Sequence, residues 1–465
     1  MARYAAPGER GSVVSYRSRY DHFIGGEYVP PAKGRYFADP TPVTGEPFTE
    51  LARGTAEDVD RALDAAHGAA RAWGRTSAAE RANVLHEVAD RVEDHLDALA
   101  VAETWDTGRP VGETLAVDLP SAVEHLRYCA GLVRVREGGI TPVGDDVVAY
   151  RYPEPLGVVG RLVAPDFPLL TAVRELAPAL AAGNAVVLKP AEQTPASIHV
   201  LVGLIADLLP PGVVNVVNGF DIGAGRALAA SRRVAAMPFG SGADDGGSCP
   251  NIFFADVAAR RDAFHDRALT GFAAFARDRG EPFRALVQST VHDEFLADAV
   301  ERTKALAMGH PLDTATVIGA QTTRDRLDRI MSAIVAARAD GARVLCGGER
   351  ADLGGELSGG YYVTPTVFAG DVRGRAHRDE PVGPVVSVTA FDDVDDAVKI
   401  ANETARGAGA GVWSRDTGVA CRVGRQLHAR RVWVNNAPRL LGGETCRVTL
   451  DPYQRTRTLL VRDRV

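Results

Sequence analysis

The sequence has little cysteine and no long apolar run, and each shortage excludes a class of protein. No run of about 18 apolar residues is present, and the N-terminus lacks the apolar stretch of a secretory signal. The 465 residues include five scattered cysteines without a Cys-x-x-Cys pair, at Cys129, Cys249, Cys346, Cys421 and Cys446. This pattern argues against a disulfide framework and against a metal site, and it favours the reducing cytoplasm.

Lysine is also scarce, because only four of the 53 basic residues are lysine and the rest are arginine. A GC-rich genome explains such a bias, so the arginine content says nothing about phosphate binding. The 60 acidic residues give a net charge of −7. That charge argues against a dedicated nucleic-acid-binding protein.

The chain has an ordinary globular composition, with 46% hydrophobic and 24% charged residues. Its length predicts two or three domains. Strands and helices alternate at 157–163, 169–182, 184–190, 195–209 and 213–217, followed by apolar strands at 285–288, 385–391 and 432–434. The alternation predicts parallel, right-handed α/β sheets covered on both faces.

Short motifs occur in a fixed order from about residue 21 to 460. They are FIGGEY at 23–28, ETWDTGRP at 103–110, LKPAEQTP at 188–195, PGVVNVV at 211–217, GHPLD at 309–313, YYVTPT at 361–366 and VWVNN at 432–436. In this order and spacing, they resemble the aldehyde dehydrogenase superfamily.

The resemblance implies an α/β fold with three parts. A Rossmann-type dinucleotide-binding domain would comprise residues 1–132 and 156–250, and an α/β catalytic domain residues 251–444. A small oligomerisation flap would comprise residues 133–155 and 445–465. The flap implies a homodimer or tetramer, alone or with an active paralogue, and no nucleic-acid or membrane partner.

The family oxidises aldehydes through a cysteine thiolate, and this sequence departs from the family where that thiolate belongs. Residues 275–283, which form the loop where the family has its cysteine, read FARDRGEPF and contain no cysteine, serine or threonine. None of these side chains supplies the soft nucleophile that an aldehyde requires. Cys249 is the candidate substitute, although an isolated cysteine is more often a small buried hydrophobe.

Carboxylates stand at further positions of the expected site. Asp166 replaces the asparagine that donates to the oxyanion, where a carboxylate would repel negative charge. Alternatively, Asp166 caps the helix that starts near Leu169. Asp244 aligns with the general-base glutamate, or forms part of a solvated acidic turn, and Glu281 lies in the altered loop. These three are the candidate acid/base residues.

Several residues match the cofactor site of the family. Lys189 and Glu192 match the pair that holds the adenosine ribose, and Glu380 matches the glutamate that holds the nicotinamide ribose. Gly240 and Ser241 match the turn before the helix that binds the pyrophosphate. A structural ion pair is an equal alternative for Lys189.

The pyrophosphate helix itself is expected to be missing. Only residues 242–245 connect the turn to the next matching segment, and four residues span at most about 14 Å. Asp221 adds a negative charge where the family has glycine. The sequence leaves two alternatives, NAD or NADP held with reduced affinity, or no cofactor.

Three functions are therefore compatible with the sequence. The missing nucleophile favours a pseudoenzyme that acts as a structural or regulatory subunit. The first alternative is a cleft that now performs non-redox acid/base chemistry. The second is an NAD(P)-dependent aldehyde dehydrogenase with a substitute nucleophile.

Overall fold

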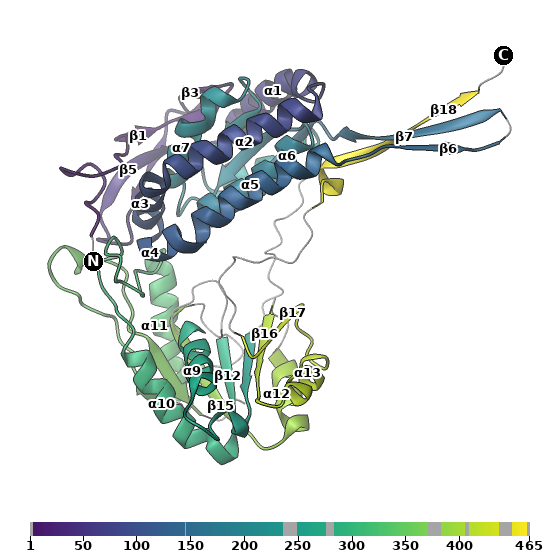
Figure 1. Ribbon diagram of the computed structural model, residues 1–465. Coiled ribbons are helices and arrows are strands. Elements are labelled where there is room, and N and C mark those ends of the chain that lie inside the picture. The colour runs from purple at the N-terminus through teal and green to yellow at the C-terminus, as the bar shows by residue number, and fades with distance from the viewer. Residues whose placement is uncertain are drawn as a thin grey trace.

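The computed structural model describes residues 3–144, 146–235, 249–275, 283–370, 383–404, 409–436 and 449–462. Figure 1 shows two lobes, one built mainly from the N-terminal half and one from the C-terminal half, and a long β-arm that projects from the first lobe. No helix among the described residues is long and apolar enough to cross a membrane.

The first lobe contains a five-stranded sheet with the order β3-β2-β10-β9-β8. Its strands are β2 (His22–Ile24), β3 (Glu27–Val29), β8 (Val158–Val163), β9 (Ala185–Pro190) and β10 (Val214–Val216). β8, β9 and β10 are parallel, whereas β2 is antiparallel to β10. All six residues of β9 are buried, as expected for a parallel strand covered on both faces.

Helices cover this sheet in layers, because α1 and α6 pack directly on its strands and α2, α5 and α7 pack on α6. They are α1 (Ala56–Trp73), α2 (Ala78–Asp94), α3 (Leu96–Thr107), α4 (Val111–Glu113), α5 (Leu119–Arg134), α6 (Pro168–Ala181), α7 (Ala196–Ile205) and α8 (Arg226–Ala230). Beside them lies a three-stranded sheet of β1 (Arg19–Tyr20), β4 (Tyr36–Pro40) and β5 (Pro47–Ala52).

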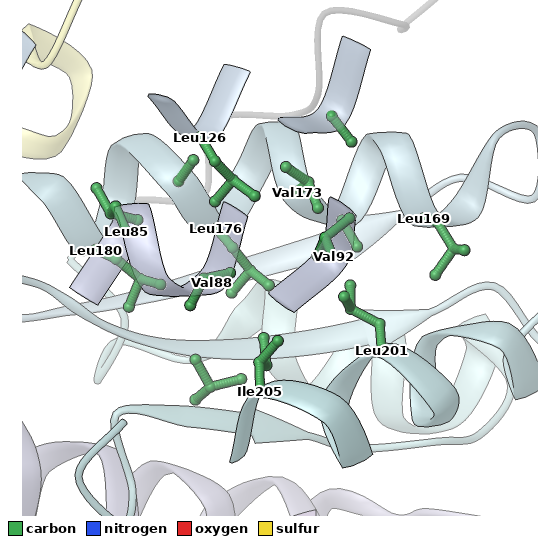
Figure 2. Packing of buried hydrophobic residues seen from close by; sticks show 14 of the residues in the cluster. Leu85, Val88, Val92, Leu126, Leu169, Val173, Leu176, Leu180, Leu201 and Ile205 are labelled. Atoms are coloured by element: carbon green, nitrogen blue, oxygen red, sulfur yellow. The ribbon is translucent and has the colours of Figure 1, made fainter. Parts of the chain in front are cut away.

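The main core of this lobe lies where α2, α5, α6 and α7 meet. Figure 2 shows Leu85 and Val88 of α2, Leu176 of α6, and Leu201 and Ile205 of α7 pointing into one apolar cluster. Each of these side chains is at most 3% exposed. Burial of one such leucine contributes about 2 kcal/mol to the free energy of unfolding, so this cluster fixes the sheet and its covering helices as one unit.

The second lobe is built on a seven-stranded sheet with the order β13-β14-β15-β12-β11-β16-β17. Its strands are β11 (Cys249–Phe253), β12 (Phe283–Gln288), β13 (Arg343–Cys346), β14 (Thr366–Ala369), β15 (Val385–Phe391), β16 (Gly409–Trp413) and β17 (Arg431–Val434). All pairs are parallel except β13 with β14. Its helices are α9 (Ala263–Phe275), α10 (His292–Lys304), α11 (Arg324–Ala339), α12 (Val394–Thr404) and α13 (Thr417–Gly424).

The β-arm consists of β6 (Gly139–Pro142), β7 (Val147–Pro155) and β18 (Gln454–Arg462), in the order β18-β7-β6. The antiparallel register runs from Gln454 opposite Pro155 to Arg462 opposite Val147. Segments that are about 300 residues apart in sequence thus form one ribbon (Figure 1). The expected α/β fold is confirmed, and the exact domain boundaries stay a prediction.

Candidate functional site

The residues expected to hold the adenosine ribose, Lys189 and Glu192, lie at the carboxyl end of β9. Lys189 is the fifth residue of β9 and is 1% exposed. Its Nζ donates to Glu192 Oε2 at 3.0 Å and also to Asp221 Oδ1. In doubly wound sheets, ligands bind at this edge because the carboxyl ends of parallel strands meet there.

This cluster has the chemistry needed to hold a sugar diol. A lysine ammonium has three N–H donors, and the described residues accept two of them. The two carboxylates can accept hydrogen bonds from neighbouring hydroxyl groups. The ion pair and the ligand contact, which the sequence offered as alternatives for Lys189, are therefore compatible in one geometry.

Asp166 lies just before α6, but it does not cap that helix. The N-cap residue is Phe167, in the left-handed conformation with φ of 55°, and its own side chain makes no capping hydrogen bond. Asp166 Oδ1 instead accepts a hydrogen bond from Nη1 of Arg326 at 2.9 Å. The capping interpretation is wrong, because the carboxylate turns toward a guanidinium on α11 in the other lobe.

This ion pair also changes the electrostatic argument about Asp166. Arg326 is the third residue of α11, and only 16% of its side chain is exposed. A guanidinium at hydrogen-bond distance offsets most of the carboxylate charge. The expected repulsion of an oxyanion by an isolated carboxylate is therefore overstated. Sequence reasoning missed Arg326 because 160 residues separate the two partners.

A buried acid lies beside the first turn of the same helix. Glu103 of α3 is fully buried, and its Oε2 accepts a hydrogen bond from the backbone N–H of Leu169 at 3.0 Å. Burial, with the charge of the nearby Asp118 as a second cause, raises the pKa of Glu103 to about 8. Near it, the Arg109 guanidinium stacks on the ring of Phe167 at 3.9 Å. Glu103 and Arg109 both belong to the ETWDTGRP motif, which in the sequence alone indicated only the family resemblance.

Cys249 begins β11 and is 2% exposed. In the parallel ladder it lies opposite Phe283, the first residue of β12. It also packs in an apolar cluster with residues such as Phe253 and Val287. Its surroundings are therefore those of a buried cysteine. It nevertheless lies at the end of the sheet where β12 begins, directly after the segment in which the nucleophile was expected.

Other expected site residues lie outside the described residues. They are Asp244, Glu281, Gly240, Ser241 and Glu380, and the connection at 242–245 lies outside them as well. Within the described ranges, no group of three or more histidine, cysteine, aspartate or glutamate side chains could hold a metal ion.

The chain is similar to curated aldehyde dehydrogenases along almost its whole length. Fluoroacetaldehyde dehydrogenase of Streptantibioticus cattleyicolor is 55% identical over 497 aligned positions, which cover 99% of this chain and 98% of that protein. The EPTC-inducible aldehyde dehydrogenase of Rhodococcus erythropolis is 51% identical with the same coverage. The first alignment is longer than the 465 residues of this chain, so that relative has segments which this chain lacks.

Solved structures agree with this similarity. HpcC of Thermus thermophilus superposes with a TM-score of 0.84 at 33% identity, covering 96% of this chain and 94% of that chain. P. syringae AldA, an indole-3-acetaldehyde dehydrogenase in complex with NAD+ and IAA, gives a TM-score of 0.86 at 29% identity, covering 97% of both chains.

These relatives overturn the pseudoenzyme that the sequence favoured. Relatives at 50–55% identity over 99% of the chain are named as aldehyde dehydrogenases rather than as structural or regulatory subunits. The alternative that no cofactor binds finds no support either, because similar structures hold NAD+. A family model for the aldehyde dehydrogenase family matches residues 28–248 and 243–442. The chain belongs to the aldehyde dehydrogenase family.

Proposed function

We propose that this protein oxidises a small aldehyde to its carboxylic acid with NAD(P) as the hydride acceptor. The observation that carries the proposal is the 55% identity over 99% of the chain to a fluoroacetaldehyde dehydrogenase. The scattered cysteines favour a cytoplasmic location for this reaction.

The residues at the end of β9 suit the cofactor. The Lys189 ammonium and the Glu192 carboxylate, 3.0 Å apart, offer both a donor and an acceptor to ribose hydroxyl groups. When bound, NAD(P) accepts the hydride that leaves the substrate. Because Lys189 is buried, its ammonium is held in one position and orients the sugar without further ordering of the side chain.

We further propose that Cys249 is the nucleophile of this reaction. Residues 275–283 contain no cysteine, and the register places Cys249 opposite Phe283, where that loop ends. The Cys249 thiolate would add to the carbonyl carbon of the aldehyde, and loss of the hydride from that carbon, which bound NAD(P) would take up, would leave a thioester. Water then hydrolyses the thioester, which releases the acid and restores the thiol. Asp244 and Glu281 are the candidate bases for that water.

The activity is tested by following NADH or NADPH absorbance with acetaldehyde or fluoroacetaldehyde as substrate. We expect aldehyde-dependent turnover of about 1 s⁻¹ or more, the range typical of enzymes. Absence of turnover with both coenzymes would overturn the proposed function.

The nucleophile is tested with Cys249→Ala beside Cys129→Ala, a buried cysteine of α5 in the other lobe. We expect Cys249→Ala to lower turnover at least about 1,000-fold, as loss of a nucleophile does, and Cys129→Ala to leave it within a few-fold. Full activity in Cys249→Ala would disprove the role of this thiol and leave the proposed reaction standing.

A further inference from the structure

Lys189 carries two acidic partners rather than one. Glu192, three residues later, lies 3.0 Å from Nζ, and Asp221, which follows β10, also contacts Nζ. The side chain of Lys189 is 1% exposed, that of Glu192 is 19% exposed and that of Asp221 is 71% exposed. The cluster is therefore a buried ammonium between a half-buried and an open carboxylate.

We propose that Asp221 makes this site selective for an unphosphorylated ribose, so that the protein binds NAD in preference to NADP. The inference rests on the proposed function, because it assumes that the ribose next to the adenine lies at Lys189. It adds a residue that determines which of the two coenzymes is used.

The selectivity follows from the charges in the cluster. One ammonium and two carboxylates leave a net charge of −1. A vicinal diol is neutral and donates hydrogen bonds to carboxylates, so it suits both Glu192 and Asp221. A 2′-phosphate carries a charge of nearly −2 and only accepts hydrogen bonds at neutral pH, so the same carboxylates repel it. Two acids beside one lysine therefore discriminate against NADP more strongly than Glu192 alone.

The exposure of Asp221 supports a role toward a ligand. The ammonium of Lys189 already has a charge partner in Glu192. Asp221 adds a second carboxylate whose side chain remains largely open to solvent, where a ligand can reach it. The residue before it, Phe220, stacks its ring on the guanidinium of Arg53 at 5.0 Å. Among the described residues, no ion pair joins Arg53 to Asp221.

The test measures binding of NAD and NADP to the full-length chain by isothermal titration calorimetry. We expect the dissociation constant for NADP to exceed that for NAD at least about 30-fold. In Asp221→Asn, which keeps the side-chain shape and removes the charge, we expect this ratio to fall about tenfold, mainly through tighter NADP binding. Asp207→Asn is the matched control, because Asp207 is an exposed acid of the same lobe, paired with Arg91 at 3.2 Å. It should leave the ratio unchanged.

Each outcome separates the inference from the proposed function. Equal binding of the two coenzymes by the unaltered protein, or an unchanged ratio in Asp221→Asn, overturns the role of Asp221 and leaves NAD(P) use intact. Binding of neither coenzyme overturns both. If Asp221→Asn does not fold, as judged by circular dichroism, Asp221→Gly provides the same comparison with the residue that is usual in the family.

Discussion

Three carboxyl groups buried in the first lobe have strongly raised pKa values. Glu103 and Asp106 of α3 and Asp39 of β4 are all fully buried. Burial is the main cause that raises the pKa of each, and for Glu103 the value reaches about 8. These groups therefore hold protons in the folded protein that they release in the unfolded chain.

We expect the free energy of unfolding to fall as pH rises from about 6.5 to about 8. The pKa of Glu103 is about 8 in the folded protein and near 4.5 in the unfolded chain. Its stabilising contribution is therefore complete below pH 4.5 and is lost as the pH rises through about 8. The slope is at most about 1.4 kcal/mol per pH unit for one such group. His22 and His199 do not mask it, because burial lowers their pKa values to about 4 and their opposing effect ends near pH 6.5.

The measurement is urea unfolding of the unaltered protein and of Glu103→Gln across this pH interval. The glutamine keeps an oxygen for the N–H of Leu169 and cannot ionise. Its stability should depend less on pH than that of the unaltered protein. Parallel pH profiles would show that Glu103 is already ionised in the folded state.

At the scale of elements, the end of α3 depends on one glycine. Gly108 follows Thr107 with φ of 73°, in the left-handed region, and its N–H donates to the carbonyl oxygen of Thr104 at 2.8 Å. A Cβ at Gly108 would lie 2.9 Å from the carbonyl oxygen of Ala320 and 3.0 Å from Pro42. The helix can therefore end here and pack closely against the neighbouring segments only without a side chain.

Gly108→Ala should lower the free energy of unfolding by about 2 kcal/mol or more, from backbone strain and close contact together. Gly131→Ala is the matched control, because Gly131 lies within α5 and a Cβ there would have no atom within 4 Å. That substitution should stabilise the protein by about 0.5–1 kcal/mol. Chemical denaturation of both variants measures the two effects. Similar stability in both would refute the argument from Gly108.

At the scale of the whole molecule, the β-arm leaves apolar side chains uncovered. Leu460 of β18 is 61% exposed and Ile140 of β6 is 69% exposed. β18 is an edge strand, with β7 as its single neighbour in the described sheet. An exposed apolar edge favours pairing with another chain. We propose that a second copy of this chain covers the arm, which makes the protein a homodimer or tetramer.

Multi-angle light scattering at micromolar concentration should give the mass of a dimer or tetramer, and Leu460→Asp should shift it toward the monomer. A charge at a buried apolar contact costs several kcal/mol of association free energy. Val335→Asp is the control, because Val335 is 62% exposed on α11 and this helix lies away from the arm (Figure 1). A monomeric unaltered protein would refute the proposal.

The sequence by itself determined the local architecture of this protein. Strands predicted at 184–190 and 213–217 correspond to β9 and β10, and the helix predicted at 169–182 corresponds to α6. These elements follow from apolar periodicity within short windows, which needs no knowledge of distant residues. The family motifs likewise lie within short stretches, so the family and the Lys189–Glu192 pair were accessible from the sequence.

Only the tertiary structure decided what the charged groups of the site contact. Arg326 forms an ion pair with Asp166, which is 160 residues away in sequence, and Lys189 forms one with Asp221, which is 32 residues away. A sequence pattern carries no distance between such segments, because their approach depends on how the sheets and helices pack. The raised pKa of Glu103 also depends on tertiary packing, because its main cause is burial of the carboxyl group by the helices that cover it. The sequence therefore determined which groups are present, and packing decided which charges oppose or neutralise one another.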